Sequence, residues 1–147
     1  MVGFIVTGHG EFALGLKSAI DMVAGNQEAL EFVPFDGSEA ASYGDTLRAA
    51  ISAMREKNDG VIVFVDLLGG TPFNQAMMIS NDVDGVEVVT GTNLPILIEL
   101  LLTRGDSSDA AALSESAVAT GRASVTHQSM AAMMAAGSDD DDEEEGL

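Results

Sequence analysis

Short apolar runs alternate with longer amphipathic segments along most of the chain. Four of the runs are rich in β-branched or aromatic residues and lie between turn-forming residues, which is typical of buried β-strands. These predicted strands are residues 2–7 (VGFIVT), 30–35 (LEFVPF), 61–66 (VIVFVD) and 86–90 (VEVVT). The third run gives the clearest signal, because it is continuous and glycines flank it.

Between these runs, apolar residues recur every three or four positions, the spacing of one helix face. In the first such segment, 11–24, the apolar stripe comprises Phe12, Leu16, Ala19, Ile20 and Val23. Further helices are predicted from Tyr43 to Met54 and over 73–80, 95–104 and 108–120. Continuous apolar strands that alternate with amphipathic helices favour a doubly wound α/β fold, with a mainly parallel four-stranded sheet and helices on both faces.

The end of the chain departs from this alternation. Gly121 is predicted to end the helix over 108–120, and RASVTHQ (122–128) is interpreted as a last strand. Alanine and methionine then dominate, and an acidic run, DDDDEEE, repels itself and cannot bury apolar surface. We therefore expect one domain over 1–128 and a disordered Ala/Met-rich and acidic tail over 129–147.

The charge of the chain narrows the classes of partner. Its 147 residues include 24 Asp and Glu against 6 Lys and Arg, for a formal net charge of −18. Affinity for the phosphate backbone of nucleic acids comes from lysine and arginine, so we expect no nucleic-acid partner. With no cysteine and two histidines, we expect neither a disulfide nor a metal site. No run approaches the roughly 18 apolar residues of a membrane span, which predicts a soluble protein with no direct membrane insertion.

One of the two histidines, His9, stands between Gly8 and Gly10 where the first predicted strand ends. Three interpretations compete: a phosphate-binding loop, a buried structural histidine, and a reactive imidazole at the edge of the sheet. Backbone N–H groups from Gly10 onward, where a helix begins, would seat an anion beside the ring. The other histidine, His127, lies near the predicted tail and is interpreted as incidental.

The phosphate-loop interpretation is disfavoured by one position. The stretch GEFALGLKS (10–18) is close to the Walker pattern, but Leu16 stands where that pattern has its lysine. Lys17 is rotated by about 100° further around the helix, so it would not reach the phosphates. A nucleotide site is therefore not expected here.

Asp66 ends the third predicted strand, on the same edge of the sheet as His9. In common doubly wound orders the first and third strands are adjacent, so the two side chains are expected to face each other. A carboxylate on one imidazole nitrogen sets the tautomer and makes the other nitrogen more nucleophilic. The alternatives stay open that Asp66 only forms a turn or caps a helix, and that His9 is structural.

The segment GGTP (69–72) follows Asp66 and offers a second seat for an anion. Gly69 and Gly70 give a flexible backbone, Thr71 adds a hydroxyl and is predicted to cap the next helix, and Pro72 suits its first turn. An imidazole beside such a seat indicates that the ring carries or transfers a phosphoryl group. The simpler alternative is that the glycines only allow the turn.

Three motifs carry a resemblance to a known family. They are GHG around His9, VDLLGGTPFN (65–74) and GTNLP (91–95). In this order and at this separation they closely resemble the mannose-type enzyme IIA domain of the bacterial phosphoenolpyruvate-dependent sugar phosphotransferase system, over roughly residues 1–128. The resemblance implies a doubly wound α/β fold and a homodimer in which a C-terminal strand, here 122–128, crosses to the partner's sheet.

The resemblance also implies a function and the roles of individual residues. Such a protein is a cytoplasmic phosphocarrier without a cofactor: it accepts phosphate from HPr and passes it to a IIB component, with IIC and IID membrane components downstream in sugar uptake. Carried over by position, His9 is the phosphorylated nucleophile and Asp66 orients it. Thr71 and the backbone of Gly69 and Gly70 are expected close to the phosphoryl group.

Two other functions stay open on the sequence. One is a regulatory or binding module that reads the phosphorylation state of the same histidine. The other is a phosphotransfer subunit for dihydroxyacetone kinase, which the intact GGTPFN segment disfavours. The chain also departs from some family members at Leu67 and Leu68, where those members carry a hydroxyl and an aromatic residue. A hydrogen bond from position 67 is therefore lost, and the contact with IIB is expected to differ.

Overall fold

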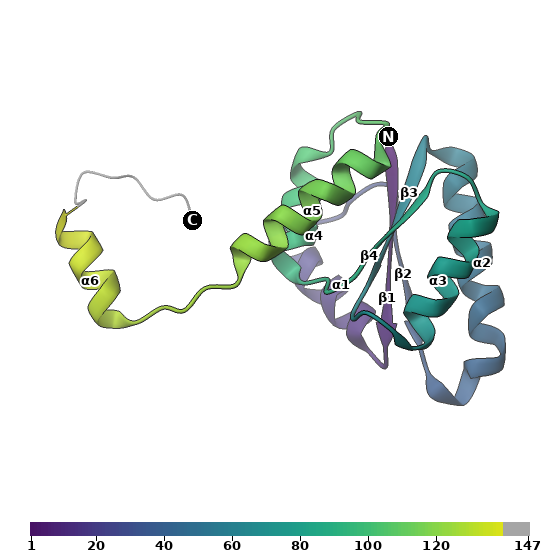
Figure 1. The fold of residues 1–147 in the computed structure, drawn as a ribbon, viewed down its shortest axis with the longest axis horizontal. Helices are drawn as coiled ribbons and strands as arrows, with labels where there is room; N and C mark the ends of the chain where they lie inside the picture. Colours follow the sequence, from purple (N-terminus) through teal and green to yellow (C-terminus); the bar gives the residue numbers. More distant parts are fainter. Residues whose placement is uncertain (140–147) are drawn as a thin grey trace.

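A computed structural model of the chain describes residues 1–139 (Figure 1). Four parallel strands form one sheet in the order β2-β1-β3-β4. Their bounds are β1 Val2–His9, β2 Leu30–Phe35, β3 Gly60–Val65 and β4 Val86–Val89. The predicted parallel four-stranded sheet is confirmed, and β1 and β3 are neighbours, as the expected meeting of His9 and Asp66 requires.

Helices cover both faces of the sheet, as predicted (Figure 1). One face carries α1 (Phe12–Val23), α4 (Leu94–Thr103) and α5 (Ala110–Ser124). The other carries α2 (Ala40–Lys57), which follows the short 3₁₀ turn η1 (Gly37–Glu39), and α3 (Gly70–Asp82). The last described helix, α6 (Met130–Asp139), belongs to neither layer.

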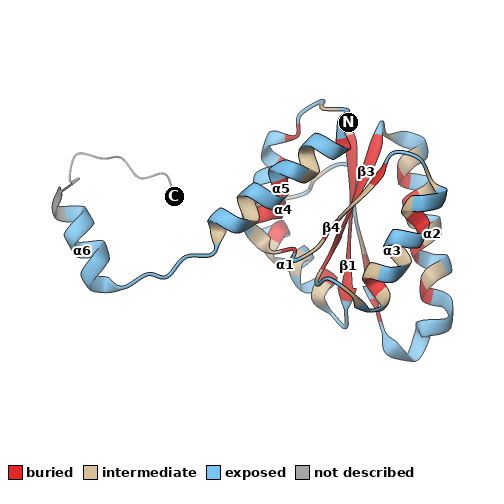
Figure 2. Ribbon diagram, in the orientation of Figure 1, coloured by how far each residue is buried: buried red, intermediate tan, exposed pale blue. Residues whose placement is uncertain are grey.

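Two hydrophobic cores lie between the sheet and these helix layers (Figure 2). Successive side chains of a strand point to opposite faces, so Phe4 and Val6 pack with α1, α4 and α5, whereas Ile5 packs with α2 and α3. All six residues of β3 are buried, which explains its continuous apolar run. The predicted stripe of α2 is also buried, at Tyr43, Leu47, Ile51 and Met54.

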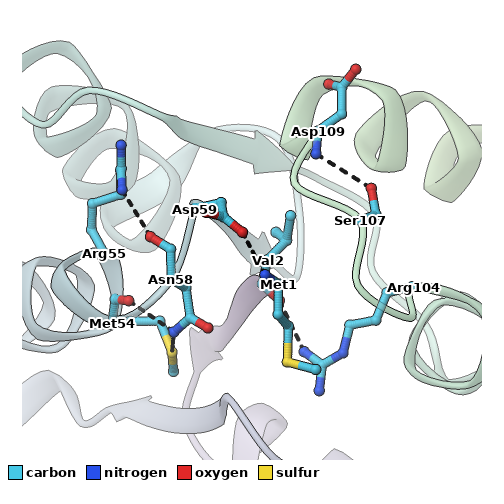
Figure 3. Close-up of polar contacts among 9 residues, drawn as sticks. All are labelled: Met1, Val2, Met54, Arg55, Asn58, Asp59, Arg104, Ser107 and Asp109. Carbon is cyan, nitrogen blue, oxygen red and sulfur yellow. Dashed lines mark hydrogen bonds and ion pairs between the residues drawn. The ribbon is translucent and has the colours of Figure 1, made fainter.

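Arg104 makes polar contacts with the chain at the amino ends of the strands (Figure 3). Its guanidinium donates to the carbonyl oxygens of Val2 at 3.0 Å, Ala29 at 3.2 Å and Glu28, and lies 4.7 Å from the centre of the Phe4 ring. Burial lowers the pKa of Arg104, and the nearby charge of Glu28 offsets part of this effect. The candidate site lies at the opposite, carboxyl edge of the sheet.

The helix predicted over 108–120 continues through Gly121, so the prediction that this glycine ends it was wrong. A Cβ atom at Gly121 would lie 2.8 Å from Cδ1 of Ile96, which is buried in α4. The glycine is therefore explained by the close packing of α4 and α5. A sequence pattern cannot distinguish a glycine that ends a helix from one that admits a neighbouring helix.

The end of the chain differs most from the predictions. No strand forms over 122–128 in the described structure: residues 122–124 complete α5, and 125–129 have no regular structure. Residues 130–139, predicted to be disordered, form α6, which projects away from the sheet and is exposed over 130–137 (Figures 1 and 2). The acidic run from residue 140 onward lies outside the described residues, and exchange of 122–128 in a dimer stays a prediction.

Among the other differences, one helix begins earlier than predicted and one residue of a predicted apolar stripe is exposed. Helix α3 begins at Gly70, three residues before the predicted start, and Val23 at the end of α1 is 62% exposed although it was expected in the apolar stripe. Across residues 1–139, no helix combines the length and apolar character that crossing a membrane requires.

The packing of α4 gives a stability prediction. Leu97 is fully buried, so Leu97→Ala should lower the free energy of unfolding by about 3–5 kcal/mol through lost contacts and a residual cavity. The matched control is Leu102→Ala in the same helix, where the side chain is 67% exposed and the expected loss is below about 1 kcal/mol. Chemical denaturation measures both values, and equal losses would contradict this orientation of α4.

Candidate functional site

The carboxyl edge of the sheet brings His9 and Asp66 together, as the sequence predicted. His9 is the last residue of β1, and Asp66 follows Val65, the last residue of the adjacent strand β3. Thr7 and Val65 are the last register pair between β1 and β3, so the residues that follow them lie at the same edge of the sheet. The His9 side chain is 47% exposed and the Asp66 side chain 11% exposed. An accessible ring thus rests on a largely buried carboxyl group.

Three N–H groups hold the Asp66 carboxylate. Its Oδ2 atom lies 2.9 Å from Nδ1 of the His9 ring and accepts the backbone N–H of His9, also at 2.9 Å. Its Oδ1 atom accepts the backbone N–H of Leu67 at 2.9 Å. Burial raises the pKa of Asp66. The hydrogen bonds from His9, the charge of a protonated His9 and the hydrogen bond from the Leu67 N–H lower it by more, so the pKa lies below its ordinary value.

This geometry selects the tautomer of His9. An ionised carboxylate only accepts hydrogen bonds, so the Nδ1 atom that faces Asp66 carries the proton. In the neutral ring, the lone pair is then on Nε2, the atom on the far side of the ring from the carboxylate. The site therefore presents a nucleophilic nitrogen at a fixed position.

The lowered pKa of Asp66 has a consequence for stability. A carboxyl group with a lowered pKa in the folded protein contributes stability above its ordinary pKa of about 4 and loses it as the pH falls through the folded value. Wild type should therefore exceed Asp66→Asn in unfolding free energy most clearly near neutral pH, and the gap should narrow below about pH 4. Urea denaturation of both proteins across this range measures the gap, and a constant gap would contradict the ionised, hydrogen-bonded carboxylate.

Gly8 makes room for this pair. A Cβ atom at Gly8 would lie 2.9 Å from Cγ of Asp66 and 2.7 Å from a ring carbon of Phe12. Any side chain at this position would displace the carboxyl group or the start of α1. The absence of a side chain at Gly8 therefore admits the carboxyl partner of His9.

The start of α3 lies against the other end of the imidazole. A Cβ atom at Gly70 would be 3.1 Å from Cε1 and 3.2 Å from Nε2 of His9, and Gly69 and Gly70 have φ angles of 93° and 85°. Such positive φ values favour glycine. The N-cap of α3 is Gly69 and no side chain caps the helix, so the predicted capping role of Thr71 was wrong. The start of α3, which no side chain caps, therefore lies at the Nε2 end of the ring. The first N–H groups of a helix have no partner within the helix, so they are available to a group bound at Nε2.

The backbone N–H of Gly10 already has a partner within the fold. Its φ is 56°, which suits glycine at this turn, but its backbone N–H donates to the carbonyl oxygen of Phe35 at 2.9 Å. That donor is therefore already used within the fold. The phosphate contact of Gly10 stays a prediction, as do those of Gly69, Gly70 and Thr71.

The remaining sequence candidates lie apart from the site. Lys17 pairs with Asp21 at 2.9 Å on the exposed side of α1, which agrees with rejecting a Walker lysine. His127 is exposed in the segment after α5. Among residues 1–139, no group of three or more His, Cys, Asp or Glu side chains could hold a metal ion.

Sequence reasoning missed the residues on the other side of the His9 ring. The Phe35 ring lies edge-on to it, with centres 5.9 Å apart, and Tyr43 packs on Phe35 at 4.6 Å. Tyr43 also contacts the hydroxyl of Thr7 at 2.5 Å. Mainly because of burial, the pKa of Tyr43 is raised to about 12; the Thr7 hydrogen bond lowers it and the charge of Asp66 raises it further. One available signal was the strand period, which places Thr7 and His9 on the same face of β1.

The chain is similar in sequence to known proteins of one family. The model of the family described as "PTS system fructose IIA component" matches residues 3–118. The chain is 33% identical over 105 residues to the PTS system fructose-specific EIIA component of Bacillus subtilis (strain 168), covering 71% of each protein. It is 35% identical over 127 residues to the PTS system mannose-specific EIIAB component of Escherichia coli (strain K12), covering 84% of this chain but 38% of that longer protein.

Solved structures with similar folds include two components of the same system. The mannose/sorbose specific IIA subunit from Enterococcus faecalis superposes with a TM-score of 0.74 at 25% identity, covering 87% of this chain and 95% of that one. The phosphotransferase system component EIIA from Streptococcus agalactiae gives a TM-score of 0.73 at 25% identity, covering 86% and 97%. The architecture described above is therefore shared nearly over the full length of these proteins.

Proposed function

We propose that this chain, which belongs to the phosphotransferase-system IIA family of the mannose, fructose and sorbose type, carries the phosphoryl group on Nε2 of His9. Membership of this family makes it a phosphotransfer component of a sugar phosphotransferase system. The observation that carries this proposal is the 2.9 Å contact between Nδ1 of His9 and Oδ2 of Asp66. It commits one ring nitrogen to the carboxylate and leaves the other beside the start of α3.

The transfer is a displacement at phosphorus. The lone pair of Nε2 forms a new N–P bond while the N–P bond of the phosphorylated HPr donor breaks, and the electron pair of that bond returns to the donor. The proton of His9 stays on Nδ1 throughout. Positive charge that develops on the ring is stabilised by the Asp66 carboxylate, as in other histidine–carboxylate pairs. Positioning and charge stabilisation supply most of the rate, since the protein has little covalent chemistry to add.

The start of α3 would hold the phosphoryl oxygens. The backbone of Gly69 and Gly70 and the hydroxyl of Thr71 lie at this uncapped helix start, and the Thr71 hydroxyl has no hydrogen-bond partner among residues 1–139. Helix starts of this kind favour anions through their free N–H groups and the helix dipole. Gly10 was also predicted to contact the phosphoryl group, and its N–H donates to the carbonyl oxygen of Phe35.

The surface beside His9 supports a protein partner with basic character. A groove of about 610 Å³ opens next to the ring. Apart from His9, its side chains are either apolar or acidic: Leu14, Pro34, Phe35, Glu11, Asp36 and Glu39. We assign HPr, the phosphate donor, to this side of the site, and a IIB component is the acceptor. IIC and IID components act downstream, and the transfer takes place in the cytoplasm. The domain that performs it is residues 1–128.

A homodimer is the proposed assembly, with residues 122–128 as the exchanged strand. Residues 125–129 have no helix or strand within this chain, so their backbone is available to pair with a partner's sheet. The Val125 side chain is 79% exposed, so it is accessible for packing against a partner. Analytical ultracentrifugation tests this assembly independently of phosphate transfer.

The function is tested by reconstituting the transfer. The protein, incubated with phosphoenolpyruvate, enzyme I and HPr, should gain one phosphate that is labile in acid and stable in alkali. Addition of a matching IIB component should remove it again. A protein that never gains phosphate contradicts the proposal. A protein that gains phosphate but passes it to no IIB component supports the alternative of a regulatory module instead.

A further inference from the structure

The Asp66 contact fixes only one point of the His9 ring. The ring turns about the Cα–Cβ and Cβ–Cγ bonds of His9, and one hydrogen bond at Nδ1 does not by itself set its tilt. A change of tilt would move Nε2 relative to the start of α3. Transfer needs the reacting nitrogen to be aligned within a small angle. Gly70 bounds the ring at Cε1 and Nε2 but has no side chain, so a further side-chain contact is needed to define the orientation of the ring.

Phe35 supplies a second contact with the ring. The two rings meet edge to face, with centres 5.9 Å apart and planes at 75°. His9 and Phe35 are also register partners in β1 and β2, and the carbonyl of Phe35 accepts the N–H of Gly10. The backbone of Phe35 is thus tied to His9 and to Gly10.

Phe35 is in turn held from below by Tyr43, whose ring packs on it at 4.6 Å. Thr7 anchors Tyr43: its Oγ1 lies 2.6 Å from the carbonyl oxygen of Val33 and 2.5 Å from the Tyr43 hydroxyl. The single hydroxyl proton of Thr7 is donated to Val33, so Tyr43 must be the donor to Thr7. The hydroxyl donors of Thr7 and Tyr43 are therefore both satisfied, and both residues are buried. Thr7, Tyr43 and Phe35 are thus held in a fixed arrangement within the fold.

We propose that Thr7, Tyr43 and Phe35 form a positioning stack that sets the tilt of the His9 imidazole, so that Nε2 stays directed at the start of α3. This proposal rests on the proposed function of His9. None of the three residues reacts: Phe35 acts by contact with the ring, and Tyr43 and Thr7 act through Phe35. The stack and Asp66 are complementary, because one constrains the tilt and the other the position of Nδ1.

The test separates ring order from phosphate transfer. With the protein labelled with ¹³C at histidine Cε1, relaxation of the His9 signal in the unphosphorylated state reports the motion of the ring. Phe35→Leu should lower the His9 order parameter and slow phosphate acceptance from saturating phospho-HPr by about 3- to 10-fold, the range that one aromatic contact supports. Phe35→Tyr keeps the ring and should restore most of the rate and the order. Tyr43→Phe, which loses only the anchoring hydroxyl, should give a smaller change in the same direction.

The control is Ile51→Val, which removes one methyl group from a fully buried residue of the same hydrophobic core. It should lower thermal stability without changing the His9 order parameter or the rate. Phe35→Leu with wild-type ring order, or Ile51→Val slowing transfer as much as Phe35→Leu, would overturn the positioning stack. If wild type accepts no phosphate, the proposed function fails, and the ring-order comparison still decides whether the stack orients His9.

Discussion

His9→Ala should carry no phosphate after incubation with phosphoenolpyruvate, enzyme I and HPr. The change removes the nitrogen that forms the new N–P bond, and removal of a nucleophile costs on the order of 10⁴-fold or more in rate. The His9 side chain is half exposed and contributes little to the core, so the variant should keep its fold. Intact-protein mass spectrometry under alkaline conditions measures the phosphate, and circular dichroism checks the fold.

The second histidine provides the matched control. His127→Ala removes the same side chain from an exposed position after α5 and should be phosphorylated at the wild-type rate. Phosphate on His9→Ala, or its loss from His127→Ala alone, would place the reacting nitrogen elsewhere and end this account of the site.

Asp66→Asn should lower the rate of phosphate acceptance by about 10²- to 10⁴-fold, the range seen when the carboxylate partner of a reacting histidine is replaced. An amide that turns its NH₂ group toward Nδ1 forces the ring proton onto Nε2, which then has no lone pair for attack. An amide in the opposite orientation sets its NH₂ group against the backbone N–H of Leu67. Neither orientation reproduces the three hydrogen bonds of the carboxylate. Rapid-quench measurement of phosphate transfer from phospho-HPr gives the rate.

The matched control for this substitution is Asp82→Asn. Asp82 pairs with Arg48 at 2.8 Å on the exposed surface of α3, away from the edge that carries His9. Asp82→Asn should leave the transfer rate within about twofold of wild type. The ion pair that it removes is exposed and contributes little to stability, and it lies away from His9. A similar loss of rate in both variants would mean that net charge, rather than the contact with His9, explains the effect of Asp66.

The meeting of His9 and Asp66 could be predicted from the sequence because it follows from topology. The apolar runs of β1 and β3 identify strands, parallel strands end at one edge, and the doubly wound order makes these two neighbours. The period of α2 likewise identified Tyr43 as a core residue. These features depend on periodicity, which a single sequence records directly.

Features that depend on contacts between distant segments could not be predicted in this way. The Cβ of any residue at position 8 would collide with Asp66, and the N–H of Gly10 is taken by Phe35, yet both glycines look alike in the sequence. The glycine in α5 was interpreted as a helix end because its neighbour Ile96 lies on another helix. For the same reason, no pattern in the sequence indicated that Phe35 supports the imidazole.

The central claim is that Asp66 holds Nδ1 of His9 and leaves Nε2 to accept phosphate, and nitrogen NMR tests it most directly. In protein labelled with ¹⁵N at its two histidines, phosphorylation should produce a nitrogen–phosphorus coupling at Nε2 of His9 and leave a protonated Nδ1 in the same ring. His127 should keep its original signals. A coupling at Nδ1 of His9, or on His127, would contradict the account.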